Sequence, residues 1–541
     1  MTDRFIHDAM STPPRRTRRT IRALAVVLVA VLAGPAAAAS PGTVTGSAEG
    51  PDGGAIVAGW ACRSAGAPAP TVRLSVGGPL SPGQPVADVA ADRPPPDGAG
   101  PCPSGAAQGF TAALSRATLF RYGGLPVSAT VAGTALAGAV GLPAWRVIGA
   151  TPRRCSIRDM DSLRSCFARA DAFDQFVFAA DVSCAGEACC KQPDRPPMEL
   201  IGLHDKLIEG NGHALRRRQG GQFACPALLV QQSQNIVVDG ITFDEDIDEP
   251  ACELATKPCA PTLRVQSAHD VRLTGVRVQA GKGYVVYVWA TDGFAFIHSV
   301  LSDAGIIGLY VGHYRYGSSR NIVVADSVIA RSRTNGLALQ GADAAGAGDP
   351  VLVMDNIFST NHWHGLWPAP GIAGGISSGG QVLVADGHDI RLTGNIVANG
   401  ACGNCNPPQQ TVPAIELADQ APLPAGVFGL TIDHNILLDG AGRAIGQNPG
   451  TAVSQVAIRD NRLTGFDTLD TVTGPAARAD NVLSPRPPDV PRLPSLADAP
   501  APGGPAEPLV WCVRPGGDGV VTATHCPPPG RIAALLGYPM R

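Results

Sequence analysis

Asp389-Ile-Arg-Leu-Thr-Gly-Asn-Ile396 is one of eight copies of a short phrase that recurs between residues 235 and 463. Other clear copies are Asn321-Ile-Val-Val-Ala-Asp-Ser-Val328 and Pro350-Val-Leu-Val-Met-Asp-Asn-Ile357. In each copy a second apolar residue follows an apolar anchor two positions later, which indicates a short strand with one buried face. The eight anchors are Ile236, Val271, Phe294, Ile322, Val351, Ile390, Leu430 and Val456.

The spacing of the copies is irregular, from 23 residues (Val271 to Phe294) to 40 residues (Ile390 to Leu430). A repeat of this length, with strands, Gly-rich turns and no helical period, predicts a solenoid of parallel strands. Parallel crossovers are right-handed, so we expect a right-handed coil. Asp326 and Asp355 stand four positions past their anchors and are interpreted as turn formers.

The position five residues past the anchor carries small polar or amide residues in the later copies. Stacked amides can hydrogen-bond from each coil to the next, so this register predicts a ladder. Its members are Ser299, Ser327, Asn356, Asn395, Asn435 and Asn461.

With this Asn run, residues 155–485 resemble the right-handed parallel β-helix of the pectate-lyase-like superfamily. The resemblance implies an all-β fold with a β-helix of about ten coils. The superfamily includes polysaccharide lyases, glycoside hydrolases, epimerases and non-catalytic surface proteins. The resemblance therefore implies a protein that binds polysaccharide, but it does not indicate which reaction, if any, the protein catalyses. The polygalacturonase-like motifs Asn-Thr-Asp and Asp-Asp are absent, which disfavours that branch.

Composition and the N-terminus indicate an exported protein. The 541 residues carry 42 Lys and Arg against 45 Asp and Glu, so net charge favours neither nucleic acid nor a membrane surface. Residues 1–39 combine a basic stretch, an apolar run and Ala37-Ala38-Ala39, the pattern of a secretory signal peptide. No later stretch is apolar for long enough to span a membrane. We therefore expect a secreted or periplasmic protein, and a monomer.

Three further segments surround the repeats. Residues 40–150 contain short alternating runs between Pro and Gly, which predicts a small β-sandwich-like module before the β-helix. Asp159 to Ala170 has helical spacing and capping residues, and is expected to cover the first coil of the solenoid. Residues 486–541 form a Pro-rich tail, interpreted as a linker or a strap along the helix.

The 14 cysteines all lie beyond residue 39, and an even number in an exported chain indicates disulfides. Natural local pairs are Cys62 with Cys102, Cys402 with Cys405, and Cys512 with Cys526. Cys402 and Cys405 form a C-x-x-C motif, so a redox role or half of a zinc site remains an alternative to a structural bridge.

Aromatic residues make up 5% of the chain but gather in the middle coils. A solenoid places equivalent positions of successive coils side by side, so these rings are expected to form one strip on which sugar rings can lie. The alternative is that the rings fill the interior or pack loops. Gly283, Gly308, Gly336 and Gly365 are aligned as the starts of successive strands. The expected substrate-binding residues are Tyr287, Trp289, Tyr310, Tyr314, Tyr316 and Trp367.

Cations in the same coils suit β-elimination or epimerisation of a uronate, which needs a cation for the carboxylate and a base for the adjacent proton. Arg315 or Arg333 would hold the carboxylate and Lys282 or His313 would be the base. The full set of candidate catalytic residues is Lys282, His313, Arg315, Arg333 and His364.

The acidic run from Asp244 to Glu249 offers alternate carboxylates, Asp244, Asp246 and Asp248, that suit calcium. A solvated loop is the alternative account of this run. The sequence thus predicts binding and lyase-type cleavage of an extracellular acidic polysaccharide. A non-catalytic carbohydrate-binding or surface protein is the first alternative, and a glycoside hydrolase is the second.

Overall fold

The computed structural model describes most of the chain between residues 41 and 484, and two short strands beyond it. The described residues are 41–78, 81, 83–97, 99–100, 102, 105–145, 149, 151–190, 195–218, 225–245, 260–279, 281, 283–312, 318–332, 334–343, 350–359, 361, 380–398, 413–419, 426–438, 442–484, 510–513 and 520–523. The expected signal peptide and most of the Pro-rich tail lie outside them.

The N-terminal module contains two antiparallel sheets and one helix, as the β-sandwich expectation requires. The helix α1 (Arg116–Tyr122) is capped by the Ser115 side chain, which accepts a hydrogen bond from Thr118 N. The first sheet contains β1 (Gly42–Glu49), β2 (Ala55–Ser64) and β5 (Gly105–Leu114). The second contains β4 (Gln84–Ala90), β3 (Thr71–Val76), β6 (Pro126–Val131), β7 (Thr134–Ala135) and β8 (Val140–Gly141).

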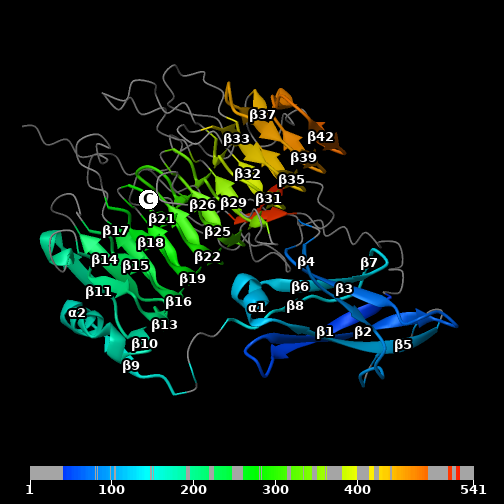
Figure 1. The fold of residues 1–541 in the computed structure, drawn as a ribbon, viewed down its shortest axis with the longest axis horizontal. Coiled ribbons are helices and arrows are strands. Elements are labelled where there is room, and N and C mark those ends of the chain that lie inside the picture. Colours follow the sequence, from blue (N-terminus) through cyan, green and yellow to red (C-terminus); the bar gives the residue numbers. More distant parts are fainter. Residues whose placement is uncertain are drawn as a thin grey trace, which may run out of the picture. The chain divides into compact units, whose positions relative to one another are not determined.

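The rest of the described chain is a right-handed parallel β-helix whose coils each contribute strands to three long sheets (Figure 1). Sheet 1 has 12 strands. They are β9 (Arg154–Ile157), β10 (Gln175–Phe178), β13 (His204–Glu209), β16 (Gln234–Asp239), β19 (His269–Thr274), β22 (Asp292–Ile297), β25 (Arg320–Ala325), β28 (Val351–Met354), β31 (Ile390–Thr393), β35 (Thr431–Asp433), β39 (Val456–Arg459) and β42 (Ala476–Ala479).

Sheets 2 and 3 follow sheet 1 within each coil, with 11 and 10 strands. Sheet 2 contains β11 (Val182–Ala185), β14 (Ala214–Arg218), β17 (Thr242–Glu245), β20 (Arg277–Gln279), β23 (Val300–Ser302), β26 (Val328–Ala330), β29 (Ile357–Ser359), β32 (Ile396–Ala398), β36 (Ile436–Leu438), β40 (Arg462–Thr464) and β43 (Val482–Ser484). Sheet 3 contains β12 (Met198–Ile201), β15 (Leu228–Gln231), β18 (Leu263–Gln266), β21 (Val286–Trp289), β24 (Leu309–Val311), β27 (Leu337–Gln340), β30 (Val382–Ala385), β33 (Ile415–Ala418), β37 (Arg443–Gln447) and β41 (Thr468–Asp470).

The predicted anchors point into the coil. Ile236 pairs with Val271, Val271 with Phe294 and Phe294 with Ile322, and all four side chains are 0% exposed. Alternate residues of all three sheets fill one continuous apolar core. Burial of one face by every coil is what makes such a stack stable, since no coil can bury its apolar face alone.

The predicted amide ladder is present at the corner between sheets 1 and 2. Asn356 Nδ2 donates to Asn395 Oδ1 at 3.0 Å, and Asn395 Nδ2 donates to Asn435 Oδ1 at 3.0 Å. Asn435 Nδ2 donates to Asn461 Oδ1 at 3.0 Å, and Asn461 Nδ2 to Asn481 Oδ1 at 2.9 Å. Each buried amide also satisfies a backbone group of its neighbour, so the ladder fixes the register of successive coils.

A second amide column, which the repeat phrase did not reveal, runs between sheets 2 and 3. Ser332 N donates to Asn361 Oδ1 at 2.9 Å, and Asn361 Nδ2 donates to Gln381 Oε1 at 3.2 Å. These side chains belong to connections of different length, so no fixed spacing marks them in the sequence.

The first coils are covered and cross-linked. The predicted capping helix is α2 (Met160–Ala168), with Asp159 and Ser162 forming a reciprocal capping box. It is followed by the 3-10 turns η1 (Ala170–Ala172) and η2 (Gly186–Cys189). Disulfides join Cys62 to Cys102, Cys155 to Cys166, Cys184 to Cys189 and Cys190 to Cys225.

The Cys62–Cys102 prediction is confirmed, whereas Cys402, Cys405 and the side chains of Cys512 and Cys526 lie outside the described residues. Four disulfides fit an extracellular or periplasmic protein. In the part of the chain that the structure describes, no helix is long and apolar enough to cross a membrane.

Two small pairs of strands complete the fold: β34 (Val427–Phe428) with β38 (Val453–Ser454), and β44 (Val510–Val513) with β45 (Val520–Ala523).

The sandwich module packs on the outer face of sheet 1. Arg272, in β19, is 2% exposed and donates hydrogen bonds to the carbonyl oxygens of Phe120 and Gly123 at the end of α1. A guanidinium at a helix C-terminus satisfies free carbonyls and complements the helix dipole. The outward side chains that share an apolar cluster with the module are Val237, Ala295, Ile297, Val323, Ala325, Leu352 and Met354.

Candidate functional site

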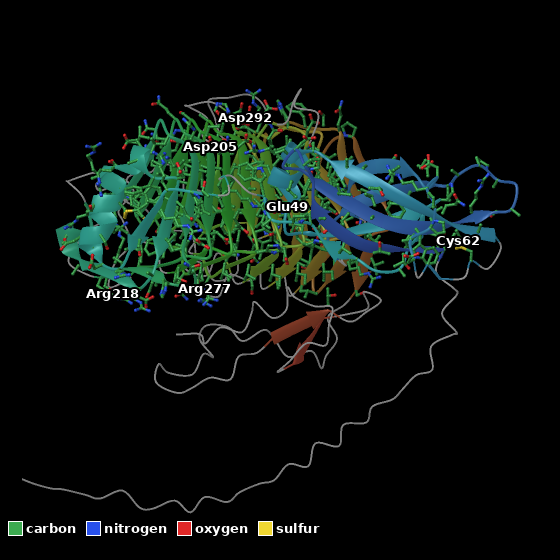
Figure 2. The ribbon with its side chains drawn as sticks, turned by 90° about the horizontal axis from the view of Figure 1, so that it is seen from below. Glu49, Cys62, Asp205, Arg218, Arg277 and Asp292 are labelled. Carbon is green, nitrogen blue, oxygen red and sulfur yellow. A yellow bond between two sulfur atoms is a disulfide. The ribbon has the colours of Figure 1, made fainter. Side chains whose placement is uncertain are left out.

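The three outer faces of the β-helix differ in what they offer a ligand. The face of sheet 1 is covered over its middle strands by the sandwich module. The face of sheet 2 carries arginines in its early coils, among them Arg218 and Arg277, which Figure 2 shows along one edge of the coils, opposite Asp205 and Asp292. In the next coils it carries an aliphatic ladder, which includes Val300, Val328, Ile357, Ile396 and Ile436.

The face of sheet 3 carries the aromatic residues. Arg264 of β18 pairs with Tyr287 of β21, and Tyr287 pairs with Tyr310 of β24, so the three form one outward column. Gln266 and Trp289 occupy the neighbouring column of the same strands. Outward positions alternate with buried leucines and valines, so strand period and coil register together place these side chains on one surface.

The rings contact one another in a continuous group. The centroids of Tyr287 and Tyr310 are 4.9 Å apart, and those of Tyr287 and Trp289 are 4.5 Å apart, both with edge-to-face geometry. Tyr284, just before β21, stacks on Tyr287 at 5.2 Å. These distances are typical of favourable aromatic pairs, and each ring restricts the movement of the next.

A cation belongs to the same group. The Arg264 guanidinium lies over the Trp289 indole, 4.3 Å from the ring centroid, within cation–π distance. Arg264, Tyr284, Tyr287 and Trp289 are half-buried, whereas Tyr310 is 8% exposed. The half-buried residues keep part of their surface for a ligand, and Tyr310 supports them. We call Arg264, Tyr284, Tyr287, Trp289 and Tyr310 the aromatic patch.

The sequence alignment of the strand starts was wrong at two positions. Gly308 lies opposite Val285, because Val286 pairs with Leu309, and not opposite Gly283. The strand after β27 begins at Val382, so Gly365 does not open it. Glycines in the corners do not keep register, because the connections between sheets 2 and 3 differ in length from coil to coil.

The structure describes only part of the predicted site, and the roles of its residues stay predictions. Tyr287, Trp289 and Tyr310 come together as the aromatic strip requires. The interior alternative does not hold for Tyr287 and Trp289, which face outward. The remaining predicted residues lie outside the described part: Lys282, His313, Tyr314, Arg315, Tyr316, Arg333, His364 and Trp367.

The acidic run that suits calcium is described only at its start. Asp244 Oδ2 accepts a hydrogen bond from Arg218 Nη2 at 2.7 Å and lies 3.6 Å from Arg216 Nε. Two guanidiniums already balance this carboxylate. Asp246 and Asp248 lie outside the described residues, and among those described no group of three or more candidate ligands is placed to hold a metal ion.

Sequence reasoning assigned no role to two charged residues on the face of sheet 3. Arg264 lies in Leu263-Arg-Val-Gln266, whose alternation marks it as outward; only the coil register shows that Trp289 is its neighbour. Glu416 of β33 lies in the column of Tyr310, beyond Ala338 and Leu383. Its Oε2 accepts from Gly380 N at 2.8 Å and the residue is 2% exposed.

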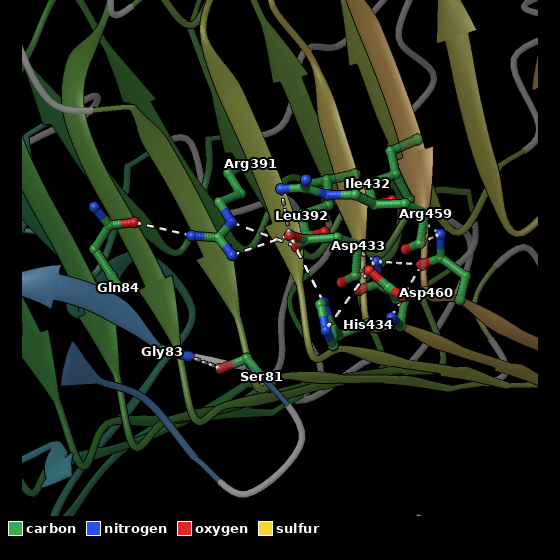
Figure 3. Close-up of polar contacts among 12 residues, drawn as sticks. Ser81, Gly83, Gln84, Arg391, Leu392, Ile432, Asp433, His434, Arg459 and Asp460 are labelled. Atoms are coloured by element: carbon green, nitrogen blue, oxygen red, sulfur yellow. Dashed lines mark hydrogen bonds and ion pairs between the residues drawn. The ribbon is translucent and has the colours of Figure 1, made fainter. Parts of the chain in front are cut away.

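A second polar group lies at the other side of the coil, near the sandwich module (Figure 3). Asp433 is 0% exposed and pairs with Arg391 at 3.0 Å, and Arg391 also donates to Gln84 of the module at 3.2 Å. Arg459 and the His434 Nδ1 atom each lie 3.7 Å from Asp433 Oδ2. Two arginines around one buried carboxylate form a structural ion-pair network between coils and module.

Comparisons with known proteins find no matching family model and no matching curated protein. Solved structures do match. The mannuronan C-5 epimerase A-module of Azotobacter vinelandii matches at 12% identity and a TM-score of 0.33, over 62% of this chain and 97% of that one. An alginate lyase from Paenibacillus sp. matches at 11% and 0.34, over 62% and 96%.

A third match is a lacto-N-biosidase from Eubacterium ramulus, at 12% identity and a TM-score of 0.42, over 64% of this chain and 62% of that one. Identities and TM-scores this low support no inference about activity, which depends on the side chains of this chain.

Proposed function

We propose that this protein is exported and binds an extracellular acidic polysaccharide across the aromatic patch. The observation that carries the proposal is the contact of Arg264 with Trp289 beside the rings of Tyr284, Tyr287 and Tyr310. Sugar rings present apolar faces that stack on aromatic rings, and a guanidinium provides charged hydrogen bonds to a carboxylate or sulfate.

The position of the patch on parallel strands suits a polymer. Successive coils are about 4.8 Å apart, and a sugar residue spans about one coil. Arg264 and Tyr287 occupy neighbouring coils in the same column, so a chain can lie along the solenoid axis with successive sugars on successive coils. The half-buried residues of the patch would then bind about two consecutive sugars.

Lyase-type cleavage is the reaction that we propose beside this patch, with the base and carboxylate-binding residues that the sequence predicts. Lys282 directly precedes Gly283 and Tyr284, and His313 follows two residues after Val311, the last residue of β24. Both therefore belong to chain segments adjoining the patch. A non-catalytic binder is the alternative, and it requires only the patch.

The test is binding and turnover of a panel of acidic and neutral polysaccharides. Titration by calorimetry at low salt should show binding to acidic members and weaker or no binding to neutral ones. Trp289→Ala should weaken binding about tenfold, because it removes one ring and the support of Arg264. Arg264→Gln should weaken binding to acidic members about 5- to 30-fold, and added salt should reduce this difference.

The chain offers a matched control for the arginine. The Arg169 guanidinium lies over the Phe173 ring at 5.4 Å in the cap region, a similar stack away from sheet 3. Arg169→Gln should leave binding unchanged. Equal loss in the Arg169 and Arg264 variants, or equal affinity for acidic and neutral polymers, would contradict the proposed site.

The same panel distinguishes the lyase from the binder. New ultraviolet absorbance from unsaturated uronate ends, together with new reducing ends, would establish elimination. Reducing ends without that absorbance would establish hydrolysis. Binding without either product would support the non-catalytic binding function and contradict the lyase activity.

A further inference from the structure

The corner between sheets 1 and 2 carries a column of titratable residues under the sandwich module. His298, Asp326 and Asp355 each follow the last residue of a sheet 1 strand, in three successive coils. All three have left-handed backbone conformations, with φ of 52°, 46° and 55°. Their side chains therefore leave the same corner and stack about 4.8 Å apart.

His298 faces two acceptors. Its Nδ1 lies 2.6 Å from Asp326 Oδ2, and its Nε2 lies 3.1 Å from the carbonyl oxygen of Gly124 in the module. A neutral imidazole can donate from one nitrogen only, whereas the imidazolium donates from both. When Nε2 donates to Gly124 O, the contact between Nδ1 and Asp326 needs one further proton, either on the ring or on the carboxyl.

Asp355 is buried against the module. It is 3% exposed, and its Oδ2 accepts from Gly78 N at 2.5 Å and from Ser81 Oγ at 3.4 Å. Its Oδ1 and the Oδ1 of Asp326 are buried without a hydrogen-bond partner among the described residues. Two neighbouring carboxylates in such surroundings cannot both ionise without cost.

We propose that docking of the sandwich module on the β-helix takes up protons at this column, so that the module is held more firmly at mildly acidic than at mildly alkaline pH. The column would make the attachment of the module, and not the folding of each part, sensitive to pH. The proposal is independent of polysaccharide binding, because sheet 3 contributes none of these residues.

The direction follows from Asp355. Burial raises the pKa of this carboxyl to about 7, the Gly78 N–H lowers it, and the Asp326 charge raises it. A carboxyl whose pKa is higher in the docked state contributes full stability below about pH 3.8, and that contribution is lost as the pH rises through about 7.

The surrounding charges do not reverse this direction. Arg391, from β31, favours the ionised form of Asp355 but is the smallest of the causes acting on it. On the other side, burial lowers the pKa of Arg272 to about 10 while Asp239 raises it, so Arg272 keeps its charge at neutral pH. Asp326 bonds to His298, and Gly78, Ser81 and Gly124 present uncharged groups.

The test is thermal unfolding of the full chain from pH 5 to pH 8.5. The Tm of the wild type should fall as the pH rises. Asp355→Asn keeps an acceptor for Gly78 N–H without the charge, so it should raise Tm by about 2–4 °C at pH 8.5 and by less than half as much at pH 5.

A matched control and a local readout complete the test. Asp480 follows the last residue of β42 at the same corner, with φ of 53°, three coils beyond β31, and Asp480→Asn should leave the pH dependence unchanged. At pH 8.5, Asp355→Asn should slow amide exchange at Gly78 and at residues 123–125, relative to the amides of β22. A change in Tm of Asp355→Asn that is equal at pH 5 and at pH 8.5 would overturn the proposal. So would changes in amide exchange that are equal in the module and in β22.

Discussion

Replacing Asn395 by Ala removes the centre of the amide ladder. Its Oδ1 accepts from Asn356 N at 3.1 Å and from Asn356 Nδ2 at 3.0 Å. Its Nδ2 donates to Val353 O at 2.9 Å and to Asn435 Oδ1 at 3.0 Å. The side chain is 2% exposed, so water does not replace these partners.

The expected loss follows from these four bonds. A buried hydrogen bond contributes about 1 kcal/mol net, and a buried group left without a partner costs about 1–3 kcal/mol. Asn395→Ala should therefore lower the free energy of unfolding by about 4 kcal/mol. Asn395→Asp should cost at least as much near neutral pH, because a carboxylate has no N–H for Val353 O and places a charge beside Asn435 Oδ1.

The control is Asn481, at the exposed end of the same ladder. It accepts from Asn461 N at 3.1 Å and Nδ2 at 2.9 Å, but it is half-buried and water can replace lost partners. Asn481→Ala should cost about 1 kcal/mol. Urea unfolding of the oxidised protein, followed by tryptophan fluorescence, measures both variants. Equal losses at Asn395 and Asn481, or a loss below about 1 kcal/mol at Asn395, would refute the reasoning.

Three further predictions concern the ends and the interface. Replacing Cys155 and Cys166 by Ala should lower the free energy of unfolding by about 2–3 kcal/mol, since their sequence separation of 11 closes a short loop. Thermal unfolding of the wild type and the variant, with and without reductant, checks this. Reductant should remove the contribution of this disulfide in the wild type. Arg272→Lys should loosen the module, because an ammonium cannot reproduce the forked contact with Phe120 O and Gly123 O; faster amide exchange in residues 119–125, with unchanged exchange in β25, would show it. Hydrogen bonds from Arg153 hold the pKa of Asp174 down to about 2, so the stability that this pair contributes should be lost as the pH falls from about 4 through 2. Asp174→Asn should remove that part of the acid sensitivity. A variant whose Tm falls with decreasing pH as steeply as that of the wild type would contradict this prediction.

The sequence was informative wherever the evidence was local and repeated. The anchors and the ladder positions recur with the same internal spacing in every copy, so each coil predicts the next without reference to connection length. The capping box of Asp159 and Ser162 is local as well, and α2 begins where it predicts. The sequence did not predict β9 (Arg154–Ile157), which comes before the helix that was expected to cover the first coil and carries no copy of the repeat phrase.

The site was only partly predictable. Clustered tyrosines indicated the aromatic patch, but Arg264 joins it from 25 residues before Trp289, across a connection that varies from coil to coil. The Gly-based alignment failed for the same reason, because glycines in connections of unequal length share no register with the strands they precede.

By itself, the sequence determined the parallel β-helix, its buried face and its amide ladder, since a periodic pattern specifies a structure that repeats over one coil. Only the tertiary structure decided that the sandwich module covers sheet 1 and that His298, Asp326 and Asp355 meet Gly78 and Gly124 beneath it. That contact joins segments more than 170 residues apart, as Gly124 and His298 show with a separation of 174. This contact forms only if the surfaces of the module and the β-helix are complementary. A repeat pattern along the sequence carries no information about that complementarity.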